Sequence, residues 1–321
     1  MAGSKSVVIA ALLANGAIAI LKFFGFLLTG SAAMLSETYH SISDTGNQIF
    51  LLIGIRFSER ERDRRHPFGY GKAQFFYSFL VSVFLFGIAG WESAKHGWTQ
   101  LTASGHGGGY TGAVDFLFIS YQPPAWLDPL WVNYSVLIGA FVFETYALVK
   151  ARAEMKRQID RNDWSGYREA FRKTSDVTTL TALTEDTIAL AGIVIALVGL
   201  FLQQQTGNPF FDQISALLIG IMLMGFALAL AWENKRLLLG ESLPADEEQR
   251  LHDVILENES VAEIIGFRTV YFGPNEVIGF ADLKFDPSLD TEAIDEKITA
   301  IESALQETNG NIRKVYIEPE A

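Results

Sequence analysis

A polar segment interrupts an apolar stretch near the start of the chain. Residues 36–48 read Ser-Glu-Thr-Tyr-His-Ser-Ile-Ser-Asp-Thr-Gly-Asn-Gln, with apolar residues on both sides. If this segment is helical, spacings of three and four residues place five polar side chains on one face: Glu37, His40, Ser41, Asp44 and Asn47. An imidazole and a carboxylate one helical turn apart can bind the same Zn²⁺ ion. We therefore predict that His40 and Asp44 are metal ligands.

The same stripe also has a structural interpretation, in which His40 is hydrogen-bonded to Asp44 between two helices and binds no metal. Ionisable groups inside a membrane cost at least ~2.5 kcal/mol each, which makes three of them on one face an expensive helix contact. We favour the functional interpretation on this ground. Glu37 and Asn47 are then candidates for supporting the site or carrying protons.

A second acidic group stands further along, where Glu185 and Asp186 precede the uncharged residues 188–202. Two adjacent carboxylates in a low dielectric need a shared cation, or one of them keeps a proton. Both are therefore candidate metal ligands or proton carriers. The alternative is that they begin a helix at the membrane surface, where the helix dipole favours acids. The helical pattern of residues 177–184 argues against it.

Two further candidates are weaker. Glu144 is a single acid in an apolar stretch, and it could either accept a proton or pair with Lys22 in the first apolar stretch. Asp63 and His66, three residues apart in a turn-rich segment, could form a weak metal site, but a solvent-exposed charged run is the simpler interpretation.

The elements that would position these residues are membrane-spanning helices. Crossing the hydrocarbon core takes roughly 20 apolar residues in a helix. Six stretches qualify, at residues 7–29, 33–57, 73–94, 130–151, 180–203 and 211–234. The sequence predicts an α-helical membrane protein with a six-helix domain over residues 1–240.

Lysine and arginine indicate the orientation of these helices. Six lie between residues 56 and 72 and eight between residues 150 and 173, whereas the first and fifth connections have none. Such clusters stay on the cytosolic side, so both termini are expected in the cytosol. No transit peptide is apparent, and we expect the inner membrane of a bacterium.

Residues 241–321 have the composition of a small soluble domain. They hold 19 of the 37 acids but six of the 25 Lys and Arg, a formal charge of −13 that argues against a nucleic-acid partner. Short mixed elements predict the ferredoxin-like order αββαβ, at residues 245–257, 263–272, 277–285, 290–306 and 312–318. A domain this small gains stability from a homodimer contact. With no cysteine in the chain, a metal would bind through His, carboxylate or backbone oxygen.

The chain resembles the cation diffusion facilitators, a family of proton-coupled zinc exporters. The resemblance covers nearly the whole chain, and four features carry it: residues 15–22 before Thr-Gly-Ser at 29–31, His40 with Asp44, the segment His-Pro-Phe-Gly-Tyr-Gly-Lys at 66–72, and Gly-Glu-Ser-Leu-Pro at 240–244. Residues 36–48 and 183–187, with Glu144, look most like the branch that contains the animal mitochondrial zinc transporter.

The resemblance implies a transport site of four side chains, in two pairs spaced four residues apart on the second and fifth spans. His40, Asp44 and Asp186 match three positions, but the fourth falls on Ala182, which has no ligand atom. Glu185 is the nearest replacement, and exchanging an imidazole for a carboxylate shifts preference toward harder ions such as Mn²⁺. The family's loop site would map to Asp63, His66 and Tyr70, so without its third ligand it is expected to be weak.

We therefore expect a homodimeric antiporter that exchanges a divalent metal ion, zinc in the first instance, for protons by alternating access. It would need no permanent cofactor, because zinc is its transported substrate. The alternatives are a transporter of the same fold selective for Mn²⁺ or another divalent ion, a membrane-embedded metal-dependent enzyme, and a metal sensor. The enzyme would need a general base and a substrate channel, for which we find no signature. The sensor is disfavoured because the soluble domain lacks a ligand cluster.

Overall fold

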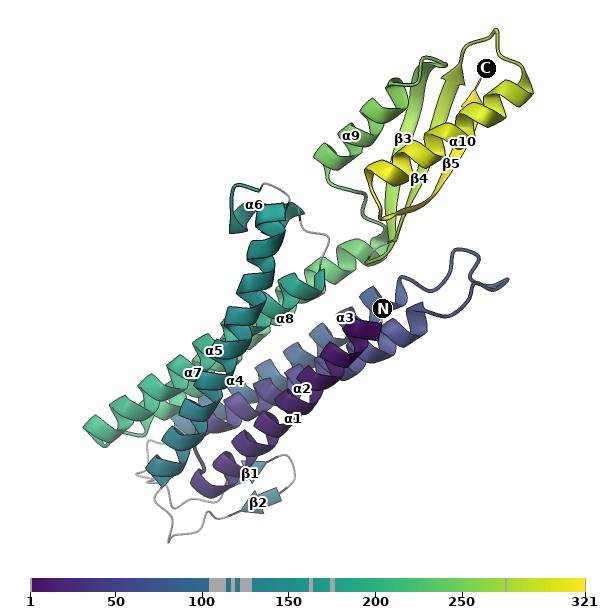
Figure 1. The fold of residues 1–321 in the computed structure, drawn as a ribbon. Helices are drawn as coiled ribbons and strands as arrows, with labels where there is room; N and C mark the ends of the chain where they lie inside the picture. Colours follow the sequence, from purple (N-terminus) through teal and green to yellow (C-terminus); the bar gives the residue numbers. More distant parts are fainter. Residues whose placement is uncertain are drawn as a thin grey trace. The chain divides into compact units, whose positions relative to one another are not determined.

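The computed structural model describes residues 2–103, 114–116, 119–121, 129–161, 164–173, 177–274 and 276–320. The chain forms two compact units, whose helices and strands are labelled in Figure 1. One unit comprises residues 1–53 and 77–232, and the other comprises residues 54–76 and 233–321. The second unit thus combines the C-terminal segment with the connection that follows the second long helix. The domain limits expected above, 1–240 and 241–321, stay a prediction.

A long helical segment occupies each of the six predicted spans. These are α1 (Ala2–Thr29), α2 (Ala32–Ser58), α3 (Ala73–Phe84) continued by the π-helical segment η1 (Leu85–Gly90) and by α4 (Trp91–Ala103), α5 (Pro129–Arg161), α7 (Val177–Thr206) and α8 (Phe210–Leu239). Three short elements complete the described part of this region: strands β1 (Val114–Phe116) and β2 (Ile119–Tyr121), and helix α6 (Tyr167–Lys173).

Five of these segments, among the described residues, are long and apolar enough to cross a membrane. The helix outside this set is α2, because its polar residues between Ser36 and Gln48 lower its hydropathy. Its 27 residues would still extend about 40 Å, more than a hydrocarbon core requires. The predicted class, an α-helical integral membrane protein with a small α+β C-terminal domain, is confirmed.

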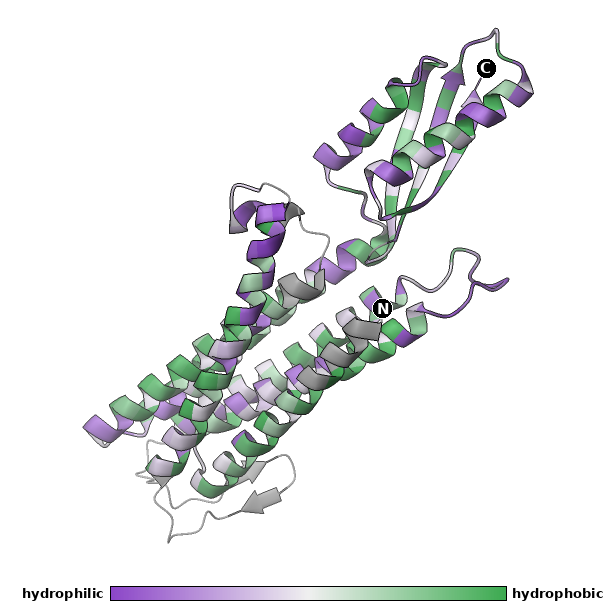
Figure 2. Cartoon of the chain, viewed as in Figure 1, coloured by the Kyte–Doolittle hydropathy of each residue, from purple (hydrophilic) through white to green (hydrophobic). Residues whose placement is uncertain are grey.

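The helices of the first unit have apolar side chains both in their shared core and on their outer surface. Buried apolar side chains from all six long helical segments form one core that includes Phe26, Met34, Leu137, Ile193 and Leu223. Large apolar side chains also face outward, such as Trp131 at 74% exposure, as expected for a surface that contacts lipid. Hydrophobic residues accordingly dominate α1, α7 and α8 in Figure 2.

Small residues let helices of this unit approach closely. A Cβ atom on Gly220 of α8 would collide with the backbone of Ala94 on α4. A Cβ on Gly97 of α4 would lie 2.6 Å from the backbone nitrogen of Leu217 on α8. The α4–α8 contact thus uses small residues in place of interlocking side chains, as membrane helices often do.

The C-terminal segment has the predicted αββαβ order. It consists of α9 (Ala245–Leu256), β3 (Val261–Gly273), β4 (Glu276–Phe285), α10 (Thr291–Thr308) and β5 (Ile312–Glu320). The sheet order is β3-β4-β5, with β3 antiparallel and β5 parallel to β4. Apolar side chains from both helices and all three strands form a separate core that includes Leu251, Ile255, Leu283, Ile301 and Leu305.

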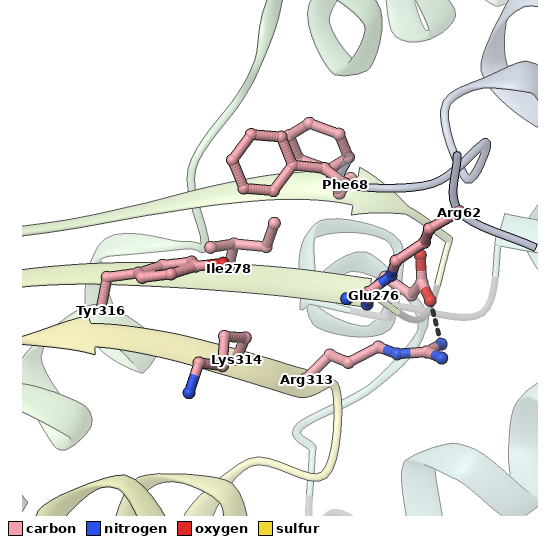
Figure 3. Close-up of a pocket in the computed structure, with 8 residues that line it drawn as sticks. Arg62, Phe68, Glu276, Ile278, Arg313, Lys314 and Tyr316 are labelled. Atoms are coloured by element: carbon pink, nitrogen blue, oxygen red, sulfur yellow. Dashed lines mark hydrogen bonds and ion pairs between the residues drawn. The ribbon is translucent and has the colours of Figure 1, made fainter. Parts of the chain in front are cut away.

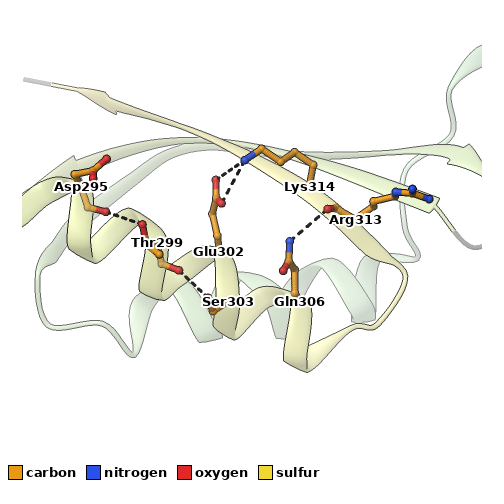
Figure 4. A network of polar contacts seen from close by, with 7 residues as sticks. All are labelled: Asp295, Thr299, Glu302, Ser303, Gln306, Arg313 and Lys314. Atoms are coloured by element: carbon orange, nitrogen blue, oxygen red, sulfur yellow. Dashed lines mark hydrogen bonds and ion pairs between the residues drawn. The ribbon is translucent and has the colours of Figure 1, made fainter. Parts of the chain in front are cut away.

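Local sequence explains how α10 begins and where it packs. Asp290 caps its start, because the carboxylate accepts a hydrogen bond of 2.9 Å from the backbone nitrogen of Ala293. Along the helix, Lys314 of β5 lies 3.4 Å from the Glu302 carboxylate, and Gln306 donates to the carbonyl oxygen of Arg313 (Figure 4). These polar contacts border the apolar face that α10 turns to the sheet.

Candidate metal site

The α2 half of the candidate site is a buried histidine with a carboxylate one turn away. The Nε2 atom of His40 lies 3.5 Å from Oδ2 of Asp44, with His40 2% and Asp44 14% exposed. This separation is at the limit of a hydrogen bond, and neither ring nitrogen of His40 has a hydrogen-bond partner. A buried polar group left unsatisfied costs about 1–3 kcal/mol. A metal cation bound to this imidazole would offset that cost.

The α7 half contains the acidic pair. Glu185 and Asp186 lie more than two turns inside α7, which begins at Val177 and has no acid in its first turn. The two acids therefore lie within the helix and do not begin it. Ala182 lies one turn before Asp186 on the same helix, and its methyl group supplies no ligand.

One hydrogen bond joins these two halves. The side-chain amide of Asn47 on α2 donates to the Glu185 carboxylate on α7. Asp44 also interacts electrostatically with Glu185, Asp186 and the α5 residue Glu144. Asp44 on α2 is thus within electrostatic range of carboxylates on two other helices, α5 and α7. No three His, Asp or Glu side chains in the described ranges are arranged so that they could already hold a metal ion.

Lys22 forms an ion pair with Glu37, whereas the sequence had suggested Glu144 as its partner. Its Nζ lies 2.8 Å from Oε2 of Glu37, and both side chains are fully buried. The alternative in which Lys22 pairs with Glu144 is therefore wrong, because the two side chains interact only electrostatically at longer range. Glu144 is itself buried in α5, and its role as a proton acceptor stays a prediction.

Asp212, at the start of α8, was not among the sequence candidates. Its carboxylate accepts hydrogen bonds from the Ser31 hydroxyl at 2.8 Å and from the backbone nitrogens of Ala32 at 2.7 Å and Ala33 at 3.3 Å. Asp212 therefore caps α2 from another helix and fixes the end from which the polar stripe starts. An acid in the first turn of an apolar span was the signal available for it.

The loop candidates Asp63 and His66 lie close together, and Asp63 is already hydrogen-bonded within the loop. Asp63 accepts hydrogen bonds from the Tyr70 hydroxyl at 2.7 Å and from the backbone nitrogens of Arg65 and His66. The bond from Tyr70 lowers the pKa of Asp63 and raises the pKa of Tyr70. The ring of Tyr70 also lies 4.2 Å from the His66 ring. Tyr70 thus stands where the family's third ligand would be, and it completes a hydrogen-bonded turn.

The same loop packs on the C-terminal sheet, within the second unit. The ring of Phe68 lies 5.2 Å from that of Phe272 and 6.4 Å from that of Tyr316. A Cβ on Gly71 would collide with the carbonyl oxygen of Phe272, so glycine permits the close approach. Figure 3 shows the hollow that these rings line, with Glu276 paired to Arg313 at its edge. Sequence reasoning missed this contact because about 200 residues separate its two sides.

Comparisons with known proteins agree with these features. The family described as "Cation efflux transmembrane domain" matches residues 8–239. The human mitochondrial proton-coupled zinc antiporter SLC30A9 is 31% identical over 295 residues, which are 92% of this chain and 48% of that protein. Metal tolerance protein C4 of Arabidopsis thaliana is 28% identical over 89% of this chain and 57% of its own length. The cation-efflux pump FieF of Serratia proteamaculans is 25% identical over 85% of this chain and 79% of its own. The chain spans about half the length of the zinc antiporters it matches.

Proposed function

The chain belongs to the cation efflux family, the cation diffusion facilitators, and on that premise we propose that it exports a divalent metal ion, with zinc as the favoured substrate, in exchange for protons. The similarity to zinc antiporters over 92% of the chain supports zinc. Members of this family are transporters, so the alternative of a membrane metalloenzyme is set aside.

The observation that carries the proposal is the environment of His40. Its imidazole is buried, lacks a hydrogen-bond partner, and lies one turn from Asp44 on a helix that also carries Glu37 and Asn47. A neutral imidazole and an ionised carboxylate form a ligand pair for Zn²⁺. In this proposal His40, Asp44, Glu185 and Asp186 bind the ion, and Asn47 orients Glu185.

Proton exchange follows from the chemistry of the same ligands. Imidazole and carboxylate bind a metal only when they are deprotonated, so metal and protons compete for one site. Metal from the cytosol displaces protons, and protons from the opposite side release the metal. In this proposal Glu144 accepts a proton during the exchange, which its electrostatic interaction with Asp44 and Asp186 supports.

The second candidate substrate is Mn²⁺, because of Ala182. The α7 half offers two carboxylates and no imidazole, a ligand set that suits harder ions better than the family pattern does. Asp63 and His66 are the candidates for a second, weak site in the loop after α2. The hydrogen bond from the Tyr70 hydroxyl to Asp63, and the contact of 3.3 Å between Asp63 and the His66 ring, argue for a structural role.

For location, we propose the inner membrane of a bacterium, with both termini in the cytosol. The clusters of Lys and Arg at residues 56–72 and 150–173 support that orientation. We also propose a homodimer, because the domain after Gly240 is small for an independent fold.

Transport by the purified protein in proteoliposomes tests the function. Zn²⁺, Mn²⁺, Fe²⁺, Co²⁺ and Cd²⁺ are offered in parallel, with protein-free liposomes as the control. We expect zinc to enter fastest. If manganese enters fastest, the fold assignment stands and the zinc assignment fails. If no metal enters faster than in protein-free liposomes, the proposal is wrong.

A further inference from the structure

A buried ion pair between α1 and α2 lies outside the proposed set of ion ligands. Lys22 of α1 and Glu37 of α2 form an ion pair of 2.8 Å with both side chains fully buried. Within a membrane-spanning bundle such a pair is costly to bury and rarely incidental. The amine is therefore a fixed positive charge within the first unit.

Three helices meet at this pair. Oε1 of Glu37 has no hydrogen-bond partner, and a Cβ on Gly192 of α7 would collide with it. The backbone of α7 thus packs directly on the carboxylate that holds Lys22. One carboxylate oxygen of Glu37 contacts Lys22 and the other lies against Gly192, so Glu37 holds Lys22 in place.

The Lys22–Glu37 pair lies about two helical turns from the proposed ion ligands Asp44 and Glu185. Glu37 precedes Asp44 by seven residues on α2, and Gly192 follows Glu185 by seven residues on α7, about 10 Å along each helix. At the other end, α2 and α7 are joined by Asn47 and Glu185. His40 and Asp44 lie between these two contacts on α2. The amine interacts electrostatically with His40, Asp44 and Glu144.

We propose that Lys22 is an affinity-determining residue of the ion site: a fixed cation, positioned by Glu37 and Gly192, that weakens the hold of the acidic cluster on a divalent ion. This inference rests on the proposed transport function. Asp44, Glu144, Glu185 and Asp186 alone would attract a divalent cation strongly in a low dielectric. A transporter must bind its ion weakly enough to release it. The positive charge of Lys22 near the acidic cluster lowers the affinity for the ion and so allows release.

The test separates KM from turnover in zinc uptake by proteoliposomes, with the amount of folded protein measured in each sample. Lys22→Met removes the amine and leaves Glu37 without its partner. We expect its KM for zinc to fall roughly tenfold while the maximal rate also falls, because the ion binds more tightly and leaves more slowly. Lys22→Arg keeps the charge and should have a KM close to that of the wild type.

The double variant Lys22→Met/Glu37→Gln is the matched control, because it removes both charges and leaves the net charge of the pair unchanged. We expect its KM to return most of the way to the wild-type value. If the pair only holds helices together, Lys22→Met loses folded protein and the remaining protein has an unchanged KM, which overturns the inference. In that case wild-type zinc transport would leave the proposed function intact. A wild-type protein that moves no metal overturns both.

Discussion

The side chain of Asn47 on α2 donates a hydrogen bond to Glu185 on α7, across 138 residues of sequence. This bond connects the helix that carries His40 and Asp44 with the helix that carries the acidic pair. It draws Glu185 toward α2, although Asp186 is the residue that matches the family pattern. The contact supports Glu185 as the replacement for the ligand missing at Ala182.

Glu185→Gln tests this role directly. A neutral amide is a poorer metal ligand than a carboxylate, so we expect zinc affinity to fall by at least about tenfold. Isothermal titration of the detergent-purified protein measures the affinity, with Gln204→Glu as a control that adds an acid near the end of the same helix. Unchanged affinity in Glu185→Gln would show that this carboxylate does not ligate the ion.

Ala182→His restores the family's ligand pattern on α7. The added imidazole lies one turn before Asp186, and we expect it to shift selectivity toward zinc relative to manganese. Competitive uptake of the two ions measures the ratio, with Ala182→Val as a control for added bulk. If neither Ala182→His nor Glu185→Gln alters binding, the site is not built from this turn of α7. Glu37, Asn47 and Glu144 would then be the next residues to examine.

Tyr70→His concerns the loop after α2. The Tyr70 ring lies 4.2 Å from His66, and its hydroxyl is bonded to Asp63, so a histidine at position 70 would complete three potential ligands. We expect this variant to bind one more zinc ion per chain than the wild type. Zinc content after dialysis measures it, and Tyr70→Phe serves as the control that removes the hydroxyl without adding a ligand. The same zinc content in all three proteins would contradict the expected ligand geometry.

The isolated segment 241–321 should bind zinc no better than an acidic surface does. It contains one histidine, His252, and no cysteine, and it has its own apolar core. Calorimetry on the purified segment, with circular dichroism to verify folding, measures the binding. Stoichiometric sub-micromolar binding would refute this prediction and would indicate ligation by carboxylates.

The sequence predicted the helices, the αββαβ order and the candidate ligands because each leaves a local pattern. Runs of apolar residues set the spans, and the polar stripe on α2 follows from spacing alone. Contacts between distant residues leave no such pattern. The pairing of Lys22 with Glu37 over Glu144 depends on how α1 packs against α2 and α5. Likewise, Asp212 caps α2 and Phe68 meets Phe272 only because of tertiary packing.

Zinc flux measured together with proton flux, in proteoliposomes that contain a pH indicator, tests the central claim most directly. We predict that an acidic interior accelerates zinc entry, that protons leave as zinc enters, and that His40→Ala and Asp44→Ala abolish both fluxes while the proteins still insert and dimerise. Zinc entry that ignores the pH gradient and releases no protons, or wild-type flux in either variant, would contradict the account.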